Sequence, residues 1–191
     1  MGESYGYQFY PHLTKGEGFF LSVLQKTSGS SPKSLKSGIP FDYFKKLPKK
    51  QLAIVQEWLS PNGSLNLIID PKQRVFAIPK SWSNEIAHFT QVLPHLWPGT
   101  WIGTLKKDTF IPSSDLALST ILNSNIPSIE VEKMEALRFL KKETFDLPTP
   151  ITGWHLVKYQ DLGLGWIKGV KKRFNNYYPK EWRIRMKLPN Q

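Results

Sequence analysis

The sequence predicts an α+β fold that combines a β-hairpin, a small mixed α/β domain in the middle and a second, β-rich domain. Short runs rich in β-branched and aromatic residues recur between clusters of Gly, Pro, Asn and Asp, and other segments repeat their apolar residues at helical spacing. With 191 residues, of which 40% are hydrophobic, the chain is long enough for one core of ordinary size or for two small ones.

The first block, residues 1–26, is predicted to be a β-hairpin. Residues 7–10 and 19–24 are strand-like, and the glycines of residues 15–18 supply the turn between them. An isolated two-stranded hairpin is marginal in water. We therefore expect apolar side chains such as Phe19 and Phe20 to need a larger sheet to pack against.

Residues 27–40 are predicted to be a flexible linker, because Ser, Gly, Lys and Pro offer too little apolar surface to offset the entropy of ordering. A middle α+β domain is predicted over residues 41–122. It is expected to begin with a helix over residues 50–59 and a hairpin of strands 65–69 and 74–78. A helix capped by Ser83 and lined by Ile86, Phe89 and Leu93 should follow, and then a strand over residues 101–105. The last expected element is a helix opened by Pro112-Ser113 that carries Leu118, Ile121 and Leu122.

The third block, residues 123–191, is predicted to be mainly β-structure. We expect a helix over residues 131–139, extended segments over residues 139–144 and 154–159, and a turn at residues 160–163 that leads into residues 164–170.

The net charge of +11 and a pI near 9.7 favour a polyanionic partner, either nucleic acid or an anionic membrane. The absence of cysteine excludes disulfides, thiolate metal sites and a cysteine nucleophile within this chain. The four histidines are scattered without metal-site spacing. No apolar run approaches the roughly 18 to 20 residues that span a bilayer, and no signal peptide is seen, so we expect a cytoplasmic protein.

The C-terminal stretch from Gly163 interleaves cations, amides and aromatic rings. Between Lys158 and Lys187 only Asp161 and Glu181 oppose nine basic side chains. Lys and Arg attract phosphates, and Tyr and Trp stack on unpaired bases, so the mixture suits RNA. The alternative is structural, with the aromatic residues in the core of a small barrel and the lysines solvating its surface.

This stretch resembles the PUA-like RNA-binding domain of RsmF-like members of the Sun family of ribosomal RNA cytosine-C5 methyltransferases. Residues 164–168 (LGWIK) and 176–183 (NYYPKEWR) fit the family pattern, and Asn175 stands where the family often has Lys. Residues 101–118 are similar to the segment that precedes that domain, with Asp115 near the position of a family His, and residues 7–20 are similar to the run that closes the methyltransferase sheet.

The resemblance implies a remnant hairpin of a methyltransferase domain over residues 1–26 and a PUA-like β-barrel over residues 123–191. The chain is then a fragment or a short gene product that lacks the two catalytic cysteines and the S-adenosylmethionine loop of the family. No catalytic, cofactor-binding or metal-binding residue is predicted in it. S-Adenosylmethionine is implied for the parent enzyme.

The implied partners are ribosomal RNA, of the small subunit, and the methyltransferase catalytic domain, with no membrane. The alternative function is a protein-docking module that anchors a ribosomal protein or the catalytic domain. The predicted RNA-binding residues are Lys168, Lys171, Lys172, Arg173, Asn176, Tyr177, Tyr178, Lys180 and Arg183.

Overall fold

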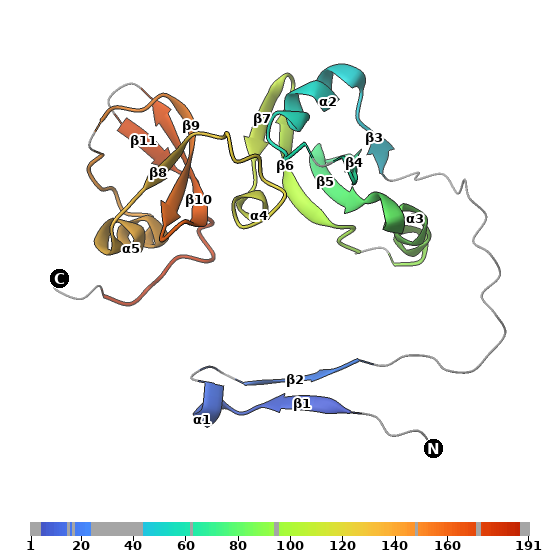
Figure 1. Cartoon of the computed structure of the whole chain (residues 1–191), viewed down its shortest axis with the longest axis horizontal. Coiled ribbons are helices and arrows are strands. Elements are labelled where there is room, and N and C mark those ends of the chain that lie inside the picture. Colours follow the sequence, from blue (N-terminus) through green and yellow to red (C-terminus); the bar gives the residue numbers. More distant parts are fainter. Residues whose placement is uncertain are drawn as a thin grey trace. The chain divides into compact units, whose positions relative to one another are not determined.

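The computed structural model describes residues 5–14, 16, 18–23, 44–61, 63–93, 96–147, 149–170 and 173–187. The chain divides into two compact units, residues 1–35 and residues 36–191. Each unit is described by itself (Figure 1). The predicted linker over residues 27–40 lies outside the described residues.

The first unit is the predicted hairpin. Strands β1 (Gly6–Phe9) and β2 (Phe19–Ser22) pair antiparallel, with Phe9 opposite Phe19 and their rings stacked at 4.2 Å. A helical turn, α1 (Pro11–Thr14), lies in the connection, which the sequence pattern did not predict. Phe19 and Phe20 are 59% and 63% exposed. The need for a larger sheet beneath them therefore stays a prediction.

The second unit contains two sheets. The first is a five-stranded antiparallel sheet in the order β3-β4-β5-β6-β7. Its strands are β3 (Lys45–Lys46), β4 (Leu65–Ile69), β5 (Arg74–Pro79), β6 (Thr100–Lys106) and β7 (Thr109–Pro112). The predicted hairpin of residues 65–78 and the strand at residues 101–105 are confirmed. We call this sheet with its helices the middle module.

Both faces of the middle sheet are covered, because strand side chains alternate between them. On one face, Val75 and Ala77 join a core cluster with residues of α2 (Lys49–Gln56) and α4 (Ser114–Ala117). On the other face, Phe76 and Ile78 pack with Phe44 and with Ile86 of α3 (Ser83–Val92).

Two predictions about the helix at Ser83 were wrong. A 3-10 turn, η1 (Lys80–Trp82), runs directly into α3, so the N-cap residue is Trp82. The Ser83 hydroxyl instead accepts a 2.7 Å bond from the Asn66 amide. Phe89 and Leu93 are 47% and 48% exposed, so of the predicted apolar face only Ile86 packs into the core.

Helix α4 begins where we predicted a helix to open, and Ser113 caps it, since its hydroxyl accepts a 3.1 Å bond from the Leu116 amide. The helix ends at Ala117, whereas we expected it to include Leu118, Ile121 and Leu122. Leu122 instead forms a β-bridge with Leu59, at the end of the segment that follows α2. Long-range pairing has replaced the later turns of the expected helix.

The second sheet has the order β11-β10-β9-β8, with β8 parallel to β9 and the other pairs antiparallel. Its strands are β8 (Ser128–Glu130), β9 (Gly153–Tyr159), β10 (Leu162–Val170) and β11 (Arg173–Asn176). Helix α5 (Lys133–Lys141) packs on one face of this sheet (Figure 1). We call these elements the C-terminal module.

Helix α5 corrects one expectation, because residues 139–141, predicted to be extended, lie in its last turn. The helix ends at Lys142, which adopts a left-handed conformation with φ of 63°. The amide of Glu143 donates to the Arg138 carbonyl at 2.9 Å, which satisfies one of the free carbonyl groups at the helix end.

The fold is therefore mixed α+β, as predicted. The described strand pairs form a two-stranded, a four-stranded and a five-stranded sheet. The barrel that the resemblance implies stays a prediction, as does the domain boundary between residues 122 and 123. Leu156 and Trp166 of the C-terminal module belong to the same core cluster as Val55 and Leu116 of the middle module. Among the described residues, no helix has the length and apolar character needed to span a bilayer.

Candidate nucleic-acid interface

The two faces of the C-terminal sheet differ in what covers them. On one face Val157 and Ile167 pack against Phe139 of α5. The register places Leu156 opposite Trp166, and Trp154 opposite Lys168. Because directly paired residues share a face of a sheet, these four side chains lie on the other face. We call it the RNA face, because it carries Lys168, a residue predicted to bind RNA.

The inner half of the RNA face, which contains Leu156 and Trp166, forms the junction with the middle module. Trp166 is 1% exposed, and its indole Nε1–H donates a 2.7 Å bond to the Ser113 carbonyl oxygen. The ring of Trp58, which follows α2, meets the Trp166 ring edge to face at 5.5 Å. Figure 1 shows α4, which Ser113 caps, between the two sheets.

The close approach of α4 requires a glycine on β10. A Cβ atom at Gly163 would collide with the backbone carbonyl oxygen of Ala117. At Gly165, where φ is 155°, a Cβ atom would lie 2.9 Å from the Phe139 ring. The glycines of the LGLGW segment therefore let β10 contact α4 on one side and α5 on the other.

The outer half of the RNA face holds three side chains that we call the aromatic–lysine cluster: Trp154, Lys168 and Tyr177. The Lys168 ammonium lies 5.2 Å from the centre of the Trp154 ring. The Tyr177 ring meets Trp154 at 4.4 Å and is 39% exposed. A cation over an aromatic face and a half-exposed ring beside it offer a phosphate contact and a stacking surface together.

The register also places Asn175 on this outer half, because it pairs directly with Lys168. Its side chain is exposed. Arg173 stands two residues before Asn175 on β11, so it shares the same face. The outer half thus combines two cations, an amide and two aromatic rings.

Two of the predicted RNA-binding residues are engaged within the module. The Asn176 amide donates to the Phe139 carbonyl at 2.8 Å and its oxygen accepts from the Tyr178 amide at 2.8 Å. The Tyr178 ring packs edge to face on Phe139 at 5.5 Å. These contacts fasten the segment after β11 to the end of α5.

The remaining predicted residues divide into three groups. Arg173, Lys180 and Arg183 are exposed, and no ion pair holds them within the described part of the chain. Lys171 and Lys172 lie outside the described residues, so their assignment stays a prediction. Lys168 and Tyr177 are the predicted residues that the fold brings into direct contact with Trp154.

Sequence reasoning missed Trp154 and Lys142. Trp154 lies at the start of β9, and a signal was available: the alternation of polar and apolar residues in that strand puts it on the face of Leu156. Lys142 donates through its ammonium to the carbonyl oxygens of Asn176, at 3.1 Å, and Tyr178. A left-handed helix end filled by lysine has no signal of its own in the sequence.

Burial shapes the ionisation of the groups at this helix end. Burial lowers the pKa of the Lys142 ammonium below its ordinary value, and the nearby Glu181 carboxylate partly opposes that change. Burial also raises the pKa of the Tyr178 hydroxyl. The Lys142 ammonium and the Tyr178 ring are bound within the module and stabilise it.

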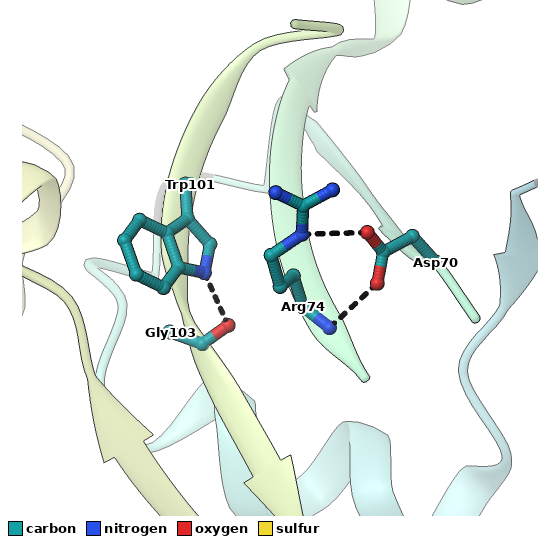
Figure 2. A network of polar contacts seen from close by, with 4 residues as sticks. All are labelled: Asp70, Arg74, Trp101 and Gly103. Carbon is teal, nitrogen blue, oxygen red and sulfur yellow. Dashed lines mark hydrogen bonds and ion pairs between the residues drawn. The ribbon is translucent and has the colours of Figure 1, made fainter. Parts of the chain in front are cut away.

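The middle module contains a separate polar network at the β4–β5 turn, shown in Figure 2. The buried Asp70 carboxylate accepts bonds from Arg74 Nε at 2.6 Å and from the Arg74 amide at 2.8 Å. The guanidinium lies 5.0 Å from the centre of the Trp97 ring. Trp101 Nε1–H donates to the Gly103 carbonyl at 2.8 Å. The network closes the turn and holds Arg74 in one orientation.

No metal site is found among the residues that the structure describes. A pocket of about 1010 Å³ lies beside α2 and β4, and Lys45 and Lys46 are the titratable side chains in its lining. Gly16 and Gly18 stand between a helix and a strand, whereas a dinucleotide loop leads from a strand into a helix. The RNA face is therefore the site with the most specific chemistry.

Comparison with known families supports this interpretation for the C-terminal module. Residues 126–184 match the family described as "Methyltransferase RsmF PUA domain". No curated protein was found to match the chain. The matched range contains the aromatic–lysine cluster, β8 to β11 and α5, and leaves the middle module and the hairpin outside it.

The C-terminal module is thus similar to a PUA domain, a class that suggests RNA binding. Within that class, it is similar to the PUA domain of the methyltransferase RsmF. The sequence resemblance to RsmF-like enzymes is confirmed for this segment. For residues 7–20 and 101–118 it stays a resemblance.

Proposed function

We propose that this chain is the RNA-binding part of an S-adenosylmethionine-dependent ribosomal RNA (cytosine-C5) methyltransferase. Its C-terminal module would hold small-subunit ribosomal RNA so that one cytosine reaches a catalytic domain. An enzyme that acts on a base in structured RNA must extrude that base, which requires the flanking RNA to be held firmly. Holding that RNA is the task that we assign to the RNA face.

The observation that carries the proposal is the aromatic–lysine cluster within a segment that matches the RsmF PUA domain. Lys168, Arg173, Lys180 and Arg183 would contact phosphates, and Tyr177 would stack on an unpaired base. The predicted roles of Lys171 and Lys172 in phosphate binding are part of the same proposal.

The chemistry belongs to the catalytic domain in this proposal. The chain has no cysteine, so a cysteine nucleophile and the second cysteine that the resemblance implies would come from that domain. S-Adenosylmethionine would bind there too. The residues of this chain would position the RNA and leave methyl transfer to its partner.

The proposal is tested by binding of the chain to small-subunit ribosomal RNA fragments across about 50 to 200 mM salt, with an unrelated folded RNA as control. We expect affinity that falls steeply with salt and that exceeds affinity for the control RNA. Absence of binding at the lowest salt, with and without the catalytic domain added in trans, would refute the proposal.

A second candidate, a protein-docking module, is favoured by apolar side chains near the C-terminus. Trp182 is 49% exposed and Met186 is 75% exposed. Exposed Trp side chains are frequent anchors at protein interfaces. Salt separates the two candidates, because an apolar anchor responds little to ionic strength whereas phosphate contacts respond strongly.

A further inference from the structure

Four lysines form a strip on the middle module, outside the segment that matches the PUA domain. They come from β3, the first turn of α2 and the β6–β7 turn, and all are exposed. The lysine strip consists of Lys45, Lys49, Lys50 and Lys107.

Helix α2 and one ion pair bring these lysines together. Lys45 pairs with Ile69, so it lies on the face of the sheet that α2 covers, four residues before Lys49. The Lys50 ammonium binds the Asp108 carboxylate at 2.9 Å, which holds the β6–β7 turn beside the start of α2. Figure 1 shows α2 between β3 and β7.

The strip is poorly neutralised by its surroundings. Asp108 is the only carboxylate that pairs with one of these lysines in the part of the chain that the structure describes. The first turn of α2 contains no acidic residue. A group of exposed ammonium groups of which only Lys50 is paired, within the described residues, raises the local concentration of polyanions.

The opposite end of α2 reaches the RNA face. Trp58 follows the helix and meets Trp154 of the aromatic–lysine cluster edge to face at 6.5 Å. An eight-residue helix is about 12 Å long. The lysine strip therefore begins roughly one short helix away from the RNA face, a distance that about four nucleotides span at about 3.4 Å per phosphate.

The side of α2 that faces solvent suits such a path. Lys49, Ala53 and Gln56 are exposed and are spaced at helical intervals, so they share one stripe. Leu52 and Val55 point to the core cluster. Glu57, at the C-cap, is the one carboxylate between the strip and the RNA face on this helix.

We propose that RNA held on the RNA face continues along α2 and is bound through its phosphates by the lysine strip. The inference rests on the proposed function and adds a second contact surface to it. The strip supplies phosphate contacts, which fix position and orientation without reading sequence. It makes the middle module part of the RNA-binding surface.

The test uses the full chain and three charge-neutralising changes, Lys45→Gln, Lys49→Gln and Lys107→Gln, combined in one variant. The matched control combines Lys72→Gln, Lys80→Gln and Lys133→Gln, which are equally exposed lysines outside the strip. Both variants lose the same net charge. A third variant, Lys168→Gln, reports on the RNA face, and thermal unfolding checks that all three variants remain folded.

For a single-stranded ribosomal RNA fragment, we expect the strip variant to reduce the slope of log affinity against log salt by about 2, at about 0.7 per lost phosphate contact. Its affinity should fall roughly tenfold or more at the lowest salt, with the control variant close to the wild type. Glu57→Gln should act in the opposite direction and tighten binding.

The outcomes separate the two proposals. If Lys168→Gln weakens binding while the strip variant matches its control, the strip is not a contact surface and the proposed function stands. Equal losses in the strip variant and its control would also overturn the inference, because they would reflect overall charge. If the wild type binds no RNA at the lowest salt, with and without the catalytic domain added in trans, both proposals fall.

Discussion

The indole Nε1–H of Trp166 donates a 2.7 Å hydrogen bond to the backbone carbonyl oxygen of Ser113, and the Trp166 side chain is fully buried. Ser113 caps α4 of the middle module, and Trp166 lies on β10 of the C-terminal module. One bond therefore ties the cap of a helix in one module to the sheet of the other. It lies on the face that continues to the aromatic–lysine cluster.

Replacing Trp166 with Phe should remove this bond and leave a small void. We expect the free energy of unfolding to fall by about 1–3 kcal/mol, as for loss of a buried donor to a carbonyl group. Urea denaturation measures the change. Trp182→Phe is the control, since Trp182 is 49% exposed; equal stability of the two variants would contradict the assigned role of the Trp166 bond.

Substitution of Gly163 with Ala should also destabilise the junction. The added Cβ would collide with the Ala117 carbonyl oxygen, a backbone atom that cannot move without displacing α4. Overpacking of this kind costs about 1–3 kcal/mol. Gly153→Ala meets no atom within 4 Å and carries only the cost of its φ of 78°. A thermal unfolding series that ranked Gly153→Ala as the more damaging change would count against this packing.

The neighbouring residues Asn175 and Asn176 should behave differently. Asn176→Ala removes two hydrogen bonds that hold the end of α5, and we expect a loss of about 1–3 kcal/mol in the free energy of unfolding. Asn175→Ala should leave stability within about 0.5 kcal/mol, because the side chain is exposed. Similar unfolding curves for both variants would show that the Asn176 contacts are unimportant.

Asn175→Lys is expected to strengthen RNA binding. The residue pairs with Lys168 on the outer half of the RNA face, so a lysine there adds a cation beside the cluster. The salt slope should steepen by about 0.7, the increment for one more phosphate contact with a single strand. An unchanged slope would place the RNA path away from β11.

Asp115 provides a test of pH dependence. Burial raises the pKa of this carboxyl group, so the folded state binds the proton more tightly than the unfolded state. Its contribution to stability is greatest below the ordinary carboxyl pKa and declines as the pH rises through the raised pKa. Asp115→Asn should therefore be more stable than the wild type at pH 7, with the difference disappearing in acid. Thermal unfolding of the wild type and the variant, at pH 7 and below the ordinary carboxyl pKa, measures the difference in stability.

Local sequence patterns predicted the strands that have clear turn residues on both sides. Residues 65–69 and 74–78 flank Asp-Pro-Lys-Gln, and both form as predicted. The short strands β8 and β11 were missed because three or four residues carry no period of their own and depend on pairing with β9 and β10. The N-cap of α3 was predicted wrongly because a 3-10 turn precedes the helix, so that the N-cap residue is Trp82 and not Ser83.

In the candidate site, too, residues with a local sequence signal were predicted, whereas contacts between distant parts of the chain were not. The basic and aromatic composition of the C-terminal stretch predicted Lys168 and Tyr177, which meet at Trp154. Trp154 itself was missed, since its neighbour in space is more than ten residues away in sequence. The same composition also singled out Asn176 and Tyr178, and their bonds to α5 are contacts that only the fold reveals.

We propose above that RNA binds on the outer half of the RNA face. Ultraviolet crosslinking of the chain to a small-subunit ribosomal RNA fragment, followed by mass spectrometry of the crosslinked peptides, tests it directly. We expect crosslinks at Tyr177 or Trp154, and we expect the Lys168→Gln change to reduce their yield. Efficient crosslinks confined to other aromatic residues, such as Trp97 or Tyr10, would contradict it.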